Sequence, residues 1–139
     1  MRLQQMSISN FRLFGNQRQY IVFNEDKPIT VLLGNNGSGK TSVLDAISIS
    51  LSTFLSPFPG LSQKNYKLED VHIESSSRIA DYLEIMLELT TPGHNKKINI
   101  SQYRLGLGKS SPKSNLVQIK EYAEFLKQSV IEEVPVILP

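Results

Sequence analysis

The sequence predicts an α/β fold, and three observations support this class. Residues 29–33 are almost wholly apolar and β-branched at their start, which is typical of a strand buried on both faces of a parallel sheet. A glycine-rich turn at 34–39 follows, and apolar residues then recur every four positions up to residue 55, which indicates an amphipathic helix. Further along, residues 83–90 alternate between apolar and polar, as half-buried strands do.

The elements before the turn are predicted to be short strands. Apolar residues alternate with serines over 6–9, which predicts a first strand, and residues 20–23 are a second β-rich run. A polar loop at 25–28 ends in proline and separates this run from the buried strand. After the turn, the helix is predicted over 39–55, because the proline-rich stretch at 56–60 stops it.

The second half of the chain is predicted to be a hairpin followed by a helix. Residues 56–80 are mixed and polar, which indicates an irregular insertion. The alternating run at 83–90 and the segment 97–105 are separated by a turn, so we expect them to pair as antiparallel strands. A helix is predicted over 115–131, and the apolar residues 134–138 read as the start of another buried strand.

The start of that second helix carries a capping pattern. Asn115 is followed three residues later by Gln118, which resembles a capping box. In such a box the two side chains satisfy backbone N–H groups reciprocally at the helix start.

Composition bounds the class of protein. The 139 residues make one domain's worth of chain, and 40% hydrophobic with 20% charged residues is ordinary for a globular protein. The absence of cysteine excludes disulfides and thiolate metal sites, and a net charge of +2 says little about partners. No run approaches the roughly 20 apolar residues of a membrane span, and there is no secretory signal, so we expect a cytoplasmic protein. His72 and His94 lie far apart in sequence and are not expected to bind a metal.

Residues 34–41, GNNGSGKT, match the phosphate-loop pattern G-x-x-x-x-G-K-[ST] at every position. The glycines permit positive φ, and successive N–H groups at a helix start form a nest for anions. Lys40 would bridge the β- and γ-phosphates, and the Thr41 hydroxyl would bind Mg²⁺. The predicted nucleotide-binding residues from this segment are Asn35, Asn36, Gly37, Ser38, Gly39, Lys40, Thr41 and Ser42. The alternative is a glycine-rich turn without a ligand, which would leave a lysine facing a nest of donors.

Two stretches of the sequence resemble the N-terminus of the RecF, SMC and OLD group of ABC-type ATPases. One is Asn10-Phe11-Arg12 at the end of the first strand, and the other runs from Asn36 to Ile47, NGSGKTSVLDAI. More loosely, LEDVHI at 68–73 and the closing VPVILP resemble bacterial AAA/OLD-like ATP-binding proteins, some of them linked to phage defence. The resemblance implies the N-terminal lobe of a P-loop, ABC-ATPase-like domain with an antiparallel β part, incomplete in this chain.

The resemblance also implies ligands, partners and a division of the chain. ATP and Mg²⁺ are the implied ligands, a head-to-head homodimer the implied assembly of the full-length protein, and DNA a candidate partner. The arginine matching Arg12 reaches the nucleotide phosphates in this group, whereas the plain reading is a solvated surface arginine. Asp45 is expected only to complement the helix dipole. Residues 1–139 would be the N-terminal portion of the ATPase head, divided into 1–55, 56–80 and 81–139.

The residues that hydrolysis requires are missing from the sequence. No apolar strand ends in Asp-Glu, and there is no ABC signature motif, so no catalytic residue is predicted in this chain. Gln102 could imitate the glutamine that senses Mg²⁺ and the attacking water, although a solvent-facing strand glutamine is the simpler reading. We therefore expect weak nucleotide binding and little hydrolysis from this chain alone.

The predicted function is ATP binding and, in the full-length protein, Mg-dependent hydrolysis linked to DNA maintenance, repair or phage defence. The main alternative is the nucleotide-binding subunit of an ABC transporter, in which Tyr20 or Phe14 would stack on adenine. A GTPase is disfavoured because NKKI at 95–98 lacks the aspartate of N-K-x-D. A binding module without activity is the remaining reading. Lysines and arginines could form a DNA-binding face, but acids are nearly as numerous, which favours an ordinary solvated surface.

Overall fold

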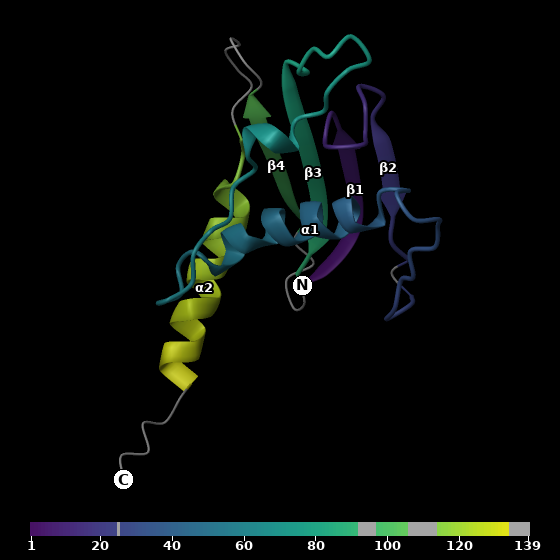
Figure 1. Cartoon of the computed structure of the whole chain (residues 1–139). Helices are drawn as coiled ribbons and strands as arrows, with labels where there is room; N and C mark the ends of the chain where they lie inside the picture. The colour runs from purple at the N-terminus through teal and green to yellow at the C-terminus, as the bar shows by residue number, and fades with distance from the viewer. Residues whose placement is uncertain (25, 92–96, 106–113, 134–139) are drawn as a thin grey trace.

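One four-stranded antiparallel sheet organises the chain (Figure 1), with the strands in the order β2-β1-β3-β4. The computed structural model describes residues 1–24, 26–91, 97–105 and 114–133, with side chains through residue 129. The strands are β1 (Arg2–Ser9), β2 (Gln19–Val22), β3 (Tyr82–Thr90) and β4 (Lys97–Leu105). The helices are α1 (Lys40–Leu55), α2 (Val117–Glu133) and the short 3₁₀ helix η1 (Leu68–Asp70).

The alternation in β3 separates the two faces of the sheet. Leu83, Ile85, Leu87 and Leu89 are buried on the face that α1 covers. The predicted antiparallel hairpin is confirmed, since β3 and β4 pair over their whole lengths from Tyr82–Leu105 to Thr90–Lys97. The core on this face is completed from β1, the loop after it, β4 and both helices, by Met6, Ile8, Phe11, Val43, Ala46, Ile98, Ile100 and Ile119.

The two helices occupy different places on this core. Helix α1 runs across the strands on one face, and α2 packs beside β4 and α1 (Figure 1). The predicted capping box at the start of α2 is wrong: Gln118 Oε1 accepts the Asn99 N–H of β4 at 2.8 Å instead of serving its own helix. Asn115 Oδ1 accepts the Val117 N–H at 3.4 Å, and its backbone pairs with Ser101 of β4. Tertiary contact with the strand has therefore replaced the local cap.

The buried strand predicted at 29–33 is wrong for this chain. These residues form no strand, and Ile29, Val31 and Leu33 are 75%, 69% and 88% exposed. A parallel strand is buried only when neighbouring strands and helices cover both of its faces. Among the described residues every strand pairs within the antiparallel sheet, and only Leu32 of this segment packs against the core.

The segment between α1 and β3 is irregular but tied to the core. The Tyr66 hydroxyl donates to the Ala46 carbonyl and lies 2.9 Å from Ser50 Oγ, and the Lys64 N–H donates to Ser52 Oγ, so both residues are tied to α1. Isolated bridges join Val71 to Phe11 and Ile73 to Ile79. The strand predicted at 134–138 and the turn predicted at 91–95 fall wholly or mostly outside the described residues. In the described ranges no helix has the length and apolar character needed to cross a membrane.

Candidate functional site

The glycine-rich turn has the backbone geometry that its sequence predicts. Gly37 and Gly39 have φ of 80° and 92°, in the left-handed region that favours glycine. Gly39 is the N-cap of α1 and receives no side-chain cap, while its carbonyl accepts the Val43 N–H at 2.9 Å. The N–H groups of the first turn precede this bond and have no acceptor within the helix, so they face the turn.

The Lys40 ammonium hydrogen-bonds to the glycine-rich turn. Its Nζ donates to the carbonyl oxygens of Gly34 and Asn35 at 2.7 Å each and to Ser38 Oγ at 3.4 Å. Both carbonyls belong to the predicted phosphate loop, so the lysine lies over the loop that a phosphate would enter. An arriving phosphate would offer the ammonium a charged acceptor in place of a neutral carbonyl, and charge-assisted bonds are the stronger ones.

A hollow of about 220 Å³ lies at this turn. It is lined by Leu13, Asn36, Gly37, Gly39, Lys40, Thr41 and Ser42. The structure therefore brings most of the predicted residues to one cavity, with Asn35 and Ser38 joined to it through Lys40. Thr41 is exposed at the cavity, so its hydroxyl is available to a metal bound with the phosphates.

Sequence reasoning missed Leu13, in the turn at residues 10–16, and gave Phe14 of the same turn only as a candidate to stack on adenine in a transporter subunit. Leu13 lines the cavity although it is 64% exposed, and Phe14 packs its ring on the glycine-rich turn. A Cβ at position 39 would lie 2.9 Å from Phe14 Cζ, so glycine is required there for space as well as for φ. Phe14 is thus a structural neighbour of the loop. The signal in the sequence for Leu13 is its position just after Asn10-Phe11-Arg12.

Arg12 does not line this cavity. Its Nε donates to Asp70 Oδ1 at 2.9 Å and its Nη1 to Asp45 Oδ2 at 2.5 Å. The guanidinium also lies 4.9 Å from the centre of the Phe11 ring. Burial alone would lower the pKa of Arg12, but the bonds to Asp45 and Asp70 outweigh it and raise the pKa. Arg12 is therefore an ion-paired side chain, unlike the solvated arginine of the plain reading.

The role expected for Asp45 is wrong. No acidic residue lies in the first turn of α1, and Asp45 instead forms the ion pair with Arg12. A carboxylate beyond the first turn gains little from the helix dipole. The ion pair ties α1 to the loop that follows β1.

That loop is held in an unusual conformation. Asn10 and Arg12 have positive φ of 53° and 51°, which is uncommon outside glycine. The Arg12 N–H donates to the Asp70 carbonyl, and His72 supports both residues: its N–H donates to the Asn10 carbonyl, and its Nδ1 lies 2.5 Å from the Arg12 carbonyl oxygen. His72 is therefore a structural residue. In the part of the chain that the structure describes, no three His, Cys, Asp or Glu side chains gather as a metal site requires.

Both readings of Gln102 are wrong. Its side chain is buried, and Nε2 donates to Thr53 Oγ1 at 3.1 Å. Thr53 lies in the last turn of α1, at the end of the helix opposite the glycine-rich turn, so Gln102 cannot act at the predicted phosphate site. It does not face solvent either, because β4 turns this residue towards the helices.

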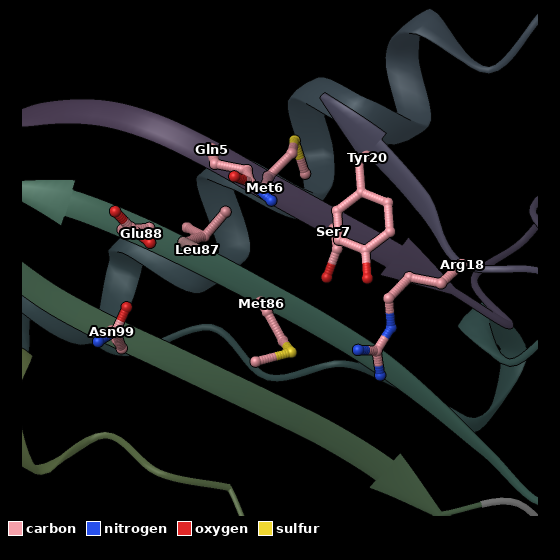
Figure 2. A pocket seen from close by; sticks show the side chains of 9 residues that line it. All are labelled: Gln5, Met6, Ser7, Arg18, Tyr20, Met86, Leu87, Glu88 and Asn99. Atoms are coloured by element: carbon pink, nitrogen blue, oxygen red, sulfur yellow. The ribbon is translucent and has the colours of Figure 1, made fainter. Parts of the chain in front are cut away.

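A second hollow, of about 200 Å³, lies on the other face of the sheet (Figure 2). It is lined by Gln5, Met6, Ser7, Arg18, Tyr20, Met86, Leu87, Glu88 and Asn99. Tyr20 lines this hollow (Figure 2) and does not line the hollow at the glycine-rich turn, so the structure gives no support to its stacking on a nucleotide held there. The nearby cations are paired, Arg18 with Glu84 and Lys97 with Glu88, which fits an ordinary mixed surface better than a basic DNA-binding face.

Tyr103, next to Arg18 on this face, gives a pH-dependent prediction. Its hydroxyl donates to Glu84 Oε1 at 2.6 Å, and this bond, with some burial, raises its pKa from the usual 10 to about 12. Because the folded-state pKa is raised, the stabilisation is complete below pH 10 and is lost as the pH rises towards 12. Alkaline titration followed by tyrosine absorbance should show a late step that Tyr103→Phe removes and Glu84→Gln moves to lower pH. An unchanged titration in Tyr103→Phe would contradict this.

A family model described as "AAA domain" matches residues 5–134 of the chain. Among curated proteins, the DNA replication and repair protein RecF of Rickettsia akari is 35% identical over 69 residues, half of this chain and 16% of that protein. The "Retron Vc95 probable ATPase" of Vibrio cholerae is 30% identical over 76 residues, 55% of this chain and 14% of that protein. The matched region thus spans less than a fifth of the length of these relatives.

Solved structures share the fold. One from work on ATP-driven dimerization and DNA-stimulated activation of SMC ATPases has a TM-score of 0.63 and 20% identity, covering 100% of this chain and 87% of its own. The SMC head domain from Thermotoga maritima has a TM-score of 0.60 and 21% identity, covering 90% of this chain and 42% of its own. At this identity the likeness concerns the fold alone.

Proposed function

The chain belongs to the AAA domain family and to its RecF/SMC/OLD-like ATPases, and from this membership we propose that the cavity at residues 34–42 binds ATP with Mg²⁺. The family supports nucleotide binding in general. The residues proposed to make the site are Asn35, Asn36, Gly37, Ser38, Gly39, Lys40, Thr41 and Ser42, with Arg12 reaching the phosphates from the neighbouring turn.

One observation carries the proposal: Lys40 lies inside the loop with only neutral acceptors. Two carbonyls at 2.7 Å and one hydroxyl hold its ammonium, and no carboxylate is among the partners that the structure shows for it. Helix N–H donors surround the same cavity, and the positive end of the α1 dipole points at it. A polyphosphate would satisfy the ammonium and these donors at once, which is the physical basis for expecting one.

The residues present also fit a magnesium ion. Mg²⁺ usually keeps several waters and takes one or two protein oxygens together with substrate phosphates. The exposed Thr41, next to Lys40 in the first turn of α1, offers one such oxygen at the cavity. When bound, the ion would neutralise charge on the β- and γ-phosphates.

We propose hydrolysis only for the full-length protein. The sequence holds no strand ending in Asp-Glu, so the metal carboxylate and the general base would come from further sequence or from a partner head. RecF is named for DNA replication and repair, and an SMC ATPase structure is described with ATP-driven dimerization. By analogy we propose a head-to-head homodimer with a role in DNA maintenance, repair or phage defence. The relatives reported above are of this kind and give no support to a transporter subunit.

Isothermal titration with a non-hydrolysable ATP analogue and Mg²⁺ tests the proposed site. Lys40→Ala should weaken binding about 10- to 100-fold, since a charge-assisted bond contributes roughly 1.5–3 kcal/mol. Lys67→Ala is the matched control: it removes the same charge from an exposed lysine whose partner is Glu69, and should leave the affinity unchanged. Equal affinities for wild type and Lys40→Ala, or no binding by well-folded protein, would refute the proposal.

A further inference from the structure

The two carboxylates that hold Arg12 are unequal. Asp70 has a side chain only 10% exposed, and Asp45 has one 43% exposed. Asp70 is also fixed by its other contacts: Oδ2 accepts the Lys67 N–H at 2.9 Å, and its carbonyl accepts the Arg12 N–H at 2.8 Å. Asp45 shows no partner other than Arg12 among the described residues. The bond from Arg12 to Asp70 therefore ends on a largely buried carboxylate held by other contacts. The bond to Asp45 ends on a half-exposed carboxylate.

The Arg12 guanidinium has N–H donors that no acceptor among the described residues uses. It carries five N–H groups in a planar fork, and the structure commits Nε to Asp70 and Nη1 to Asp45. Nη2 has no partner in the described part of the chain. Rotation of the guanidinium about the Nε–Asp70 hydrogen bond would therefore move Nη1 and Nη2, the outer edge of the fork. The bond from Nε to Asp70 would stay intact.

The outer edge lies near the phosphate cavity. Asp45 is four residues after Thr41 on α1, and a helix rises about 1.5 Å per residue, so roughly 6 Å separate the two positions along the axis. Arg12 is also next in sequence to Leu13, which lines the cavity. An ion pair as exposed as that with Asp45 is weak in water, whereas a phosphate offers a bidentate, more highly charged acceptor.

We propose that Asp70 is the pivot and Asp45 the exchangeable partner of Arg12, so that nucleotide phosphate displaces Asp45 while the bond to Asp70 persists. Asp45 and Asp70 are then positioning residues with opposite effects: Asp45 competes with the nucleotide, and Asp70 orients the guanidinium for it. This proposal rests on the proposed function of the cavity. It also makes nucleotide binding break the Arg12–Asp45 ion pair, which ties α1 to the loop after β1.

The test is the affinity of the same ATP analogue for charge-neutralising variants. Asp45→Asn should tighten binding roughly 2- to 5-fold, the range expected from removing one exposed ion-pair competitor. Glu69→Gln is the matched control, because Glu69 lines the same hollow as Arg12 and loses the same charge without contacting it. That control should leave the affinity unchanged, and Asp70→Asn should weaken binding to the level of Arg12→Gln.

An Arg12→Gln background distinguishes competition from a general change in charge. In that background Asp45→Asn should have no effect, since Arg12 is no longer present to be released. Asp45→Ser should repeat the result of Asp45→Asn, and melting curves without nucleotide verify that each variant is folded. The proposal fails if Asp45→Asn binds as wild type or more weakly, if Glu69→Gln has the same effect, or if the gain persists in Arg12→Gln. Should Lys40→Ala lose binding while Asp45→Asn changes nothing, this proposal alone is refuted and the nucleotide site stands.

Discussion

Replacing Phe11 by alanine is expected to lower the free energy of unfolding by about 3–5 kcal/mol, a large part of a domain's total stability. Phe11 is fully buried, and its ring meets Tyr66 edge-on at 5.5 Å between centroids. Its backbone bridges to Phe14 and Val71, so the loop after β1 and the segment after η1 both depend on it. Thermal or urea unfolding followed by circular dichroism measures the change.

A matched control separates the lost volume from the lost aromatic ring. Phe11→Leu keeps most of the apolar volume and should cost far less than Phe11→Ala, because cavity formation dominates the larger loss. Leu13→Ala, in the same loop but exposed, should leave the melting temperature nearly unchanged. A melting temperature for Phe11→Ala equal to that of wild type would show that this loop contributes little to the core.

Replacing Gly39 by alanine is expected to abolish nucleotide binding and to destabilise the fold. At a φ of 92° a side chain costs about 1–2 kcal/mol, since the left-handed conformation strains any residue with a Cβ. The new Cβ would also lie 2.9 Å from Phe14 Cζ, and such overpacking adds about 1–3 kcal/mol. Relief of the clash moves Phe14 or the turn, and the nest of N–H donors loses its shape. Titration with the ATP analogue and a melting curve measure the two effects.

Gly37→Ala is the internal comparison. Gly37 has a φ of 80°, but nothing lies within 4 Å of the position its Cβ would take, so this variant reports backbone strain without the clash. It should therefore destabilise the protein less than Gly39→Ala. Adding Phe14→Ala to Gly39→Ala should restore part of the stability and leave the strain. If the two glycine variants were equally stable, the contact with Phe14 would not matter.

The features that the sequence predicted correctly are those with a local cause. The alternation in 83–90 marks β3, because a strand with one buried face needs a period of two. The spacing of Val43, Ile47 and Leu51 predicts α1, and the phosphate-loop pattern predicts the turn that begins it, since only glycine takes positive φ without strain. The cavity at the turn follows from these neighbours in sequence.

What the sequence could not predict depends on partners that are distant in the chain. The apolar pattern at 29–33 predicts a buried strand, but Val31 is exposed in the structure. Burial of such a strand depends on neighbouring strands and helices that this sheet does not supply. Gln118 accepts a hydrogen bond from Asn99 of the sheet, and Gln102 donates one to Thr53 of α1 in the core, so both partners come from elements distant in sequence.

The amino-acid sequence by itself determined a strand-and-helix unit with a phosphate-type loop, because backbone conformation and apolar period act over a few neighbouring residues. Only the tertiary structure decided what surrounds that loop: Phe14 on Gly39, and Arg12 between Asp45 and Asp70. Asp45 and Asp70 are 33 and 58 residues from Arg12 in sequence. No local pattern encodes such a pairing, and packing of η1 and α1 against the loop after β1 brings the three charges together.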